Sequence, residues 1–135
     1  MTETVLEIDR VSKSFGDNKA NDAISMTLAR GEIVALLGEN GAGKTTLMSI
    51  LFGHYMPDEG RIRVAGADLP PGRPRAAIHA GIGMVHQHFS LAPNLTVLEN
   101  VMTGSEKLWS LRSETGRARA KLAALAERFC LVVDP

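Results

Sequence analysis

The stretch Ile33-Val34-Ala35-Leu36-Leu37-Gly38-Glu39-Asn40-Gly41-Ala42-Gly43-Lys44-Thr45-Thr46 decides the fold of this chain. Its first five residues, 33–37, form a short unbroken apolar run, which predicts a strand buried on both faces. The residues from Lys44 onward favour a helix that ends at Gly53. We therefore expect a buried strand and a helix joined by a glycine-rich loop.

The loop satisfies the pattern G-x-x-x-x-G-K-[ST] at Gly38, Gly43, Lys44 and Thr45. Glycines allow backbone angles that other residues avoid, so consecutive amide N–H groups can turn inward around phosphate oxygens. In this pattern Lys44 reaches the β- and γ-phosphates, and the Thr45 hydroxyl coordinates Mg²⁺. The positive end of the following helix points at the same anion.

A chance glycine-rich turn before a helix is the alternative explanation, but a strand and a helix on either side favour a phosphate loop. We expect a bound nucleotide to contact the loop residues Gly38, Asn40, Gly41, Ala42, Gly43, Lys44, Thr45 and Thr46.

Length and composition limit the number of domains and the classes of binding partner. The chain has 135 residues, enough for one domain, and its 15 Lys and Arg balance 15 Asp and Glu, so no strong field favours nucleic acid or anionic lipid. A single cysteine, Cys130, excludes an internal disulfide, and its apolar neighbours predict a small core residue. No signal peptide or membrane span is evident, so any membrane connection must run through a partner.

Hydrophobic periodicity places the remaining elements. Alternation of apolar and polar residues predicts strands over 5–11, 23–28 and 61–64, and the apolar run 82–85 predicts a further buried strand. Turn residues occupy 14–18, 30–32 and 57–60, and helices are expected over 73–79, 95–102 and 112–129. The last helix is basic, and a solvated face is favoured over a surface for nucleic acid or membrane.

The sequence G-E-N-G-A-G-K-T-T-L at residues 38–47 resembles the ATP-binding subunits of ABC transporters. The stretches 5–16, 30–38, 51–53, 57–62 and 82–87 are similar to that family in the same order. The resemblance implies an α/β fold: a truncated P-loop NTPase core of the ABC ATPase type, with an antiparallel β part at the N-terminus. It further implies a core sub-domain over 1–88 and the beginning of the helical sub-domain over 89–135.

Two residues outside the loop take roles from this resemblance. Phe15 would stack on adenine, although a phenylalanine before a glycine can equally serve turn or core packing. Gln87 would touch Mg²⁺ or the attacking water and contact the transmembrane partner, which makes Lys44 and Gln87 the implied catalytic residues. His86 and His88 flank Gln87 without a nearby Cys or acidic residue, a weak pattern for zinc.

The stretch 85–101 is most similar to bacterial importers of nucleosides and simple sugars. The resemblance implies an ATPase that uses ATP and Mg²⁺ to drive uptake. Its implied partners are transmembrane permease subunits, a second ATPase domain (a dimer or a fused half) and, indirectly, a substrate-binding protein, with no nucleic acid. The protein would then sit at the cytoplasmic face of the cell membrane, held peripherally by the permease.

The family's L-S-G-G-Q signature, its strand ending in Asp-Glu and its switch histidine are absent from these residues. The apolar run that ends at Asp134 lacks the following Glu. We therefore expect an N-terminal fragment that does not hydrolyse ATP alone, whereas the intact protein is an ATPase. A non-hydrolytic nucleotide-binding fragment, a soluble ABC ATPase outside transport and a P-loop kinase of small metabolites remain alternatives.

Overall fold

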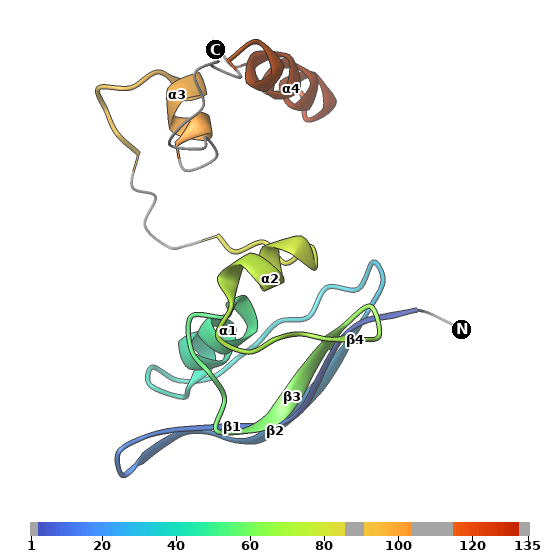
Figure 1. Ribbon diagram of the computed structural model, residues 1–135, viewed down its shortest axis with the longest axis vertical. Helices are drawn as coiled ribbons and strands as arrows, with labels where there is room; N and C mark the ends of the chain where they lie inside the picture. Colours follow the sequence, from blue (N-terminus) through green and yellow to red (C-terminus); the bar gives the residue numbers. More distant parts are fainter. Residues whose placement is uncertain (1–2, 86–90, 104–114, 133–135) are drawn as a thin grey trace. The chain divides into compact units, whose positions relative to one another are not determined.

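The computed structural model describes residues 3–85, 91–103 and 115–132 (Figure 1). The chain forms two compact units, Met1–Val85 and His86–Pro135. No helix in the described ranges is long and apolar enough to cross a membrane.

The first unit contains a four-stranded antiparallel sheet in the order β2-β1-β3-β4. Its strands are β1 (Thr4–Phe15), β2 (Asn18–Ala29), β3 (Glu59–Val64) and β4 (Ala67–Asp68). The strands predicted over 5–11, 23–28 and 61–64 are confirmed, because alternating residues fit a sheet with one covered face. Phe15 pairs with Asn18, so β1 and β2 meet in a two-residue hairpin whose first loop residue, Gly16, has a left-handed φ of 58°.

The long hairpin has four register shifts, and at two of them serine hydroxyls accept backbone hydrogen bonds in place of ladder partners. The register shifts between Ile8 and Val11, and the N–H of Arg10 donates to Ser25 Oγ at 2.9 Å. Two residues farther along the hairpin, the N–H of Ala23 donates to Ser12 Oγ at 2.9 Å, and Ser12 is buried. These contacts satisfy backbone groups that the bulges remove from the ladder.

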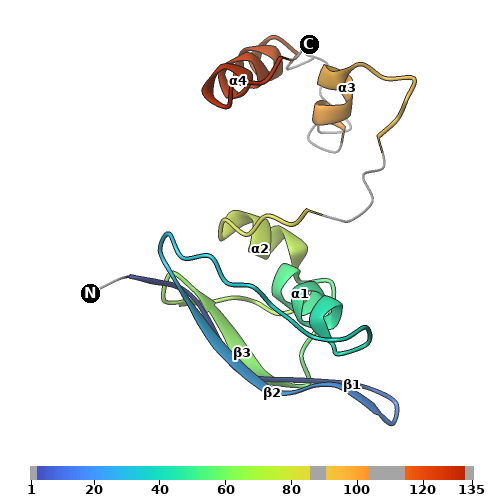
Figure 2. The same ribbon diagram turned by 180° about the vertical axis from the view of Figure 1, so that it is seen from behind.

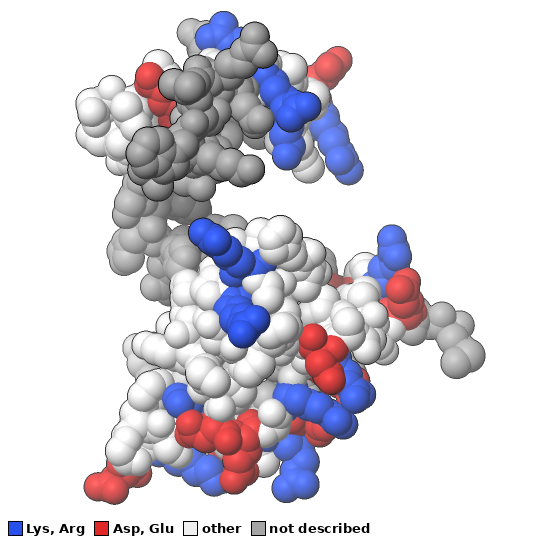
Figure 3. Space-filling view, viewed as in Figure 1, with Lys and Arg blue, Asp and Glu red and all other residues white. Residues whose placement is uncertain are grey.

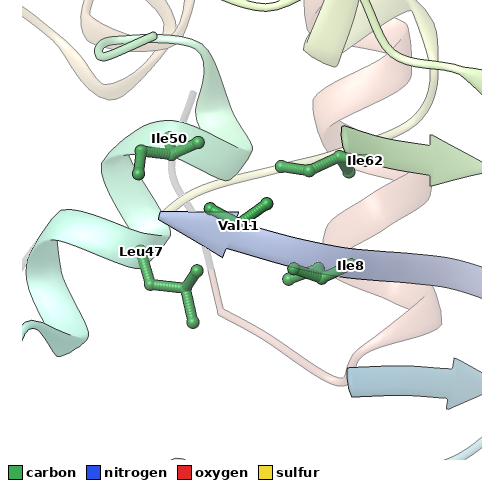
Figure 4. Packing of buried hydrophobic residues seen from close by; sticks show 5 residues of the cluster. All are labelled: Ile8, Val11, Leu47, Ile50 and Ile62. Atoms are coloured by element: carbon green, nitrogen blue, oxygen red, sulfur yellow. The ribbon is translucent and has the colours of Figure 1, made fainter. Parts of the chain in front are cut away.

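Helix α1 (Lys44–Phe52) supplies the core by packing on the sheet. Leu47 and Ile50 of α1 meet Ile8 and Val11 of β1 and Ile62 of β3 (Figure 4). The helix ends at Gly53, as predicted, where φ is 86°. Helix α2 (Pro74–His79) lies on the same side of the curved sheet, as both views show (Figures 1 and 2).

The opposite face of the sheet carries charged side chains that alternate with the core residues of β1. Arg61 contacts Asp9 at 3.1 Å, and Arg63 lies 3.8 Å from Glu7 and 2.8 Å from Asp68. Acidic and basic groups are interspersed over this part of the molecule (Figure 3). This mixture of signs suits a solvated surface.

The start of α1 rests directly on β2. A Cβ atom at Gly43 would lie 2.0 Å from the carbonyl oxygen of Ala20, and Gly43 has a φ of 80°. Both the close approach and the left-handed backbone therefore require glycine at this position. The second glycine of the phosphate-loop pattern thus has a packing reason in addition to its place in the motif.

Two predicted buried strands are wrong. Residues 33–37 and 82–85 have no strand structure, and Ile33, Leu37 and Val85 are exposed by 96%, 88% and 80%. A parallel strand needs ladder partners and cover on both faces. In the described part of the chain the sheet consists only of β1 to β4, so neither run has a neighbouring strand.

The second unit contains α3 (Val97–Met102) and α4 (Thr115–Arg128), which contact each other. Helix α3 begins two residues later than predicted because Thr96 and Glu99 form a capping box that fixes its first turn. Helix α4 buries none of its described side chains, as predicted for a solvated face. The prediction of a core position for Cys130 is wrong, because the residue is exposed.

We predict that Gly43→Ala destabilises the chain more than Gly31→Ala does. Gly31 has a similar φ of 77° but no atom within 4 Å of an added Cβ. Both variants carry the left-handed strain of about 1 kcal/mol, and Gly43→Ala adds an overpacking cost of about 1–3 kcal/mol. Urea unfolding followed by circular dichroism measures the difference, and equal free energies of unfolding would contradict the contact with Ala20.

We further predict that Ile50→Ala lowers the free energy of unfolding by about 2–5 kcal/mol, as expected for a buried side chain. Leu37→Ala should change it by less than about 0.5 kcal/mol, because Leu37 is exposed. The same urea titration applies to both variants. A large loss in Leu37→Ala would show that residues 33–37 are buried after all.

Candidate functional site

The phosphate loop is shaped by a tight turn over Glu39–Ala42. The N–H of Ala42 donates to the carbonyl oxygen of Glu39 at 3.2 Å, and Gly41, the third residue of the turn, has a φ of 85°. A left-handed third residue favours glycine. No atom lies within 4 Å of a Cβ at Gly41, so this edge of the loop is open to an approaching group.

The ammonium group of Lys44 closes the loop on itself. Its Nζ atom donates to the carbonyl oxygens of Gly38 and Glu39, each at 2.6 Å. An ammonium group has three donor hydrogens, so these two contacts leave one for a further acceptor. Lys44 therefore holds the loop in shape and offers a cation at its rim.

The first turn of α1 presents backbone donors beside this cation. Gly43 is the N-cap residue and makes no side-chain capping bond. The first N–H groups of a helix have no acceptor inside it, and they carry the positive end of the helix dipole. Thr45 and Asn40 are exposed and Thr46 is half-buried, so the start of the helix lies at the surface. The arrangement suits an anion with several oxygens, such as a polyphosphate.

The site offers a divalent cation one oxygen ligand, the Thr45 hydroxyl, beside such an anion. No group of three or more His, Cys, Asp or Glu side chains in the described ranges could hold a metal ion alone. The exposed hydroxyl of Thr45 follows Lys44 directly, and it is an oxygen ligand of the kind that Mg²⁺ accepts when phosphate oxygens complete the shell.

Phe15 stands at the hairpin end nearest the phosphate loop. It pairs with Asn18, which lies about 7 Å along the strand from Ala20, the residue that contacts Gly43. Phe15 is 45% exposed, and its ring meets the ring of Tyr55 edge to face, with centroids 5.3 Å apart. An aromatic surface is thus available close to the loop.

A cation completes the surroundings of this ring. Lys13 Nζ lies 5.5 Å from the Phe15 ring centroid and donates to Asp58 at 2.7 Å. This hydrogen bond and a second one from the Ser14 N–H lower the pKa of Asp58. The ionised Asp58 thereby ties the turn before β3 to the hairpin that carries Phe15.

Several predicted site residues lie outside the described residues. Gln87, together with His86 and His88, belongs to 86–90, and Asp134 belongs to 133–135. The proposed roles of Gln87 therefore stay predictions. Conversely, the structure brings Asn21 and Tyr55 to the site, and sequence reasoning did not single out either. The one signal for Asn21 was its type, since asparagine is depleted in strands.

Comparisons with known proteins agree with this geometry. The family model described as ABC transporter matches residues 21–132. A nucleoside import ATP-binding protein of Lactococcus lactis subsp. cremoris is 47% identical over 98% of this chain. A guanosine import ATP-binding protein of Bacillus subtilis is 44% identical, and a ribose import ATP-binding protein of Burkholderia cenocepacia 43% identical, each over 98% of this chain. This chain spans 26% of the length of each of these relatives.

Solved structures agree as well. An ATP-binding cassette of an ABC transporter in its ADP conformation matches with a TM-score of 0.80 and 29% identity, covering 93% of this chain and 54% of that one. A second structure of such a cassette matches with a TM-score of 0.77 and 26% identity, over 96% of this chain and 56% of the other. The phosphate loop, the fold and the sequence relatives lead to one conclusion: this chain belongs to the ABC transporter family.

Proposed function

We propose that this chain is the nucleotide-binding part of an ABC importer ATPase. The complete protein would couple the binding and hydrolysis of ATP to the uptake of a nucleoside or a simple sugar. The observation that carries the proposal is the closed phosphate loop, with Lys44 on the carbonyls of Gly38 and Glu39 at the start of α1. The names of these relatives, a nucleoside, a guanosine and a ribose import ATP-binding protein, support the substrate class.

In this proposal the phosphates lie against the backbone of the loop and the first turn of α1. Lys44 gives its third donor hydrogen to a terminal phosphate oxygen, and Phe15 stacks on adenine. Thr45 and Gln87 would hold Mg²⁺, which neutralises charge on the phosphates when it is bound. The exposed Thr45 hydroxyl and the open edge at Gly41 support this placement.

We infer that residues 1–88 are the core sub-domain and residues 89–135 the beginning of the helical sub-domain. The partners are transmembrane permease subunits and a second ATPase domain, with a substrate-binding protein acting indirectly. The permease would hold the protein at the cytoplasmic face of the cell membrane. The word "import" in the names of the relatives supports such an assembly.

Nucleotide binding tests the site directly. Lys44→Ala should weaken ATP binding by about 10- to 100-fold, because a charged hydrogen bond to the terminal phosphates is lost. Thr45→Val should weaken binding only when Mg²⁺ is present. Isothermal titration with ATP, with and without Mg²⁺, measures both effects.

Lys121→Ala is the matched control for the lysine, because it removes the same charge from an exposed position on α4. Its ATP affinity should equal that of the unchanged chain. An equal loss in Lys44→Ala and Lys121→Ala, or a Thr45→Val defect that is independent of Mg²⁺, would contradict the assigned roles.

Uptake of labelled guanosine or ribose by cells that carry the complete protein and its permease tests the transport function. Gln87→Ala should retain ATP binding but reduce uptake and permease-stimulated ATPase activity, because we propose that Gln87 links the metal to the partner. Asn94→Ala, a change at an exposed position in the same unit, serves as the control. Unchanged uptake in both Gln87→Ala and Lys44→Ala would exclude a role as the importer's ATPase.

A further inference from the structure

Asn21 of β2 holds the residue at which the phosphate loop becomes helix α1. The side chain is buried, with Asn21 only 5% exposed. Its Nδ2 atom donates to the carbonyl oxygen of Gly43 at 3.2 Å. That carbonyl also accepts the first hydrogen bond of the helix, from the N–H of Leu47 at 2.9 Å. The Gly43 carbonyl is therefore held by Asn21, and the Ala20 carbonyl oxygen leaves no room for a Cβ at Gly43.

This contact sets the direction of a phosphate-loop donor. The carbonyl of Gly43 and the N–H of Lys44 belong to one planar peptide group. A hydrogen bond that fixes the carbonyl on one side consequently fixes where the N–H points on the other. The Lys44 N–H is one of the unpaired donors at the helix start. Asn21 acts on the anion site through this peptide plane.

The Asn21 side chain also destabilises the folded state. Its Oδ1 atom is the single buried side-chain nitrogen or oxygen without a hydrogen-bond partner in the described ranges. A buried acceptor that loses its partners in water destabilises the folded state, and an apolar group of the same shape would avoid this loss. Asparagine is also unfavourable in a strand. Stability alone therefore does not account for an amide at this position, whereas the bond to Gly43 does.

We propose that Asn21 is a positioning residue of the nucleotide site, which orients the peptide between Gly43 and Lys44 toward the phosphates. This inference rests on the proposed function, because it requires that the loop binds a nucleoside triphosphate. It assigns a role in phosphate binding to a strand residue outside the loop pattern.

The test compares Asn21→Leu with Ser12→Ala in the 135-residue chain. Leucine has nearly the shape of asparagine but lacks the donor and the unpaired oxygen. We expect Asn21→Leu to be at least as stable in urea as the unchanged chain, while its affinity for ATP falls about fivefold. Isothermal titration with ATP gives the affinity, at a temperature at which every variant is fully folded.

Ser12→Ala provides the matched control. Ser12 is also buried in the hairpin, and it accepts a hydrogen bond from Ala23 rather than from the loop. This variant should lose stability and keep its ATP affinity, so that the two properties move in opposite directions in the two variants. If Asn21→Leu does not fold, Asn21→Val, which also lacks the donor and suits a strand, takes its place.

Unchanged ATP affinity in a folded Asn21→Leu or Asn21→Val chain would overturn the inference. An equal loss of affinity in Ser12→Ala would also overturn it, because affinity would then follow the stability of the sheet. Lys44→Ala separates these results from failure of the proposed function. If Lys44→Ala leaves ATP affinity unchanged, the loop is not the nucleotide site; if it abolishes binding while Asn21 variants bind normally, only the role of Asn21 fails.

Discussion

The contact between Gly43 and β2 is the constraint on which the position of α1 and of the phosphate loop depends. The carbonyl oxygen of Ala20 lies where a side chain at Gly43 would begin, so α1 can approach the hairpin only through a glycine. This approach brings Leu47 and Ile50 into the core with β1 and β3. The same contact places the first N–H groups of α1 at the surface, beside the loop. Packing and the proposed anion site thus share one residue.

Hydrogen bonds within the phosphate loop hold its shape. Lys44 binds two loop carbonyls at 2.6 Å, and the turn at Gly41 is closed by a backbone hydrogen bond. Such internal hydrogen bonds reduce the conformational entropy that a loop loses on binding. The Lys44 ammonium group that forms these bonds is also the positive charge that we propose for phosphate binding, so the shape of the loop and its electrostatics depend on the same group.

The aromatic and charged residues near the phosphate loop lie at the end of the β1–β2 hairpin. Phe15 lies at its tip with Tyr55 and Lys13 around the ring, and Asp58 anchors the turn before β3 to the same end. Asn21 and Ala20, a few residues along β2, contact the loop. A long antiparallel hairpin therefore provides both an aromatic surface and the support for the phosphate loop.

The sequence by itself determined the features that depend on near neighbours: the phosphate loop, α1 from Lys44 to Gly53, and the strands whose residues alternate. Turn glycines, helix ends and alternation are local properties of the backbone. Only the tertiary structure decided that 33–37 and 82–85 are not strands, that Cys130 is exposed, and that Asn21 supports the loop. Ladder partners, burial and a buried hydrogen bond depend on residues distant in the chain, which an apolar run or a single residue type does not reveal.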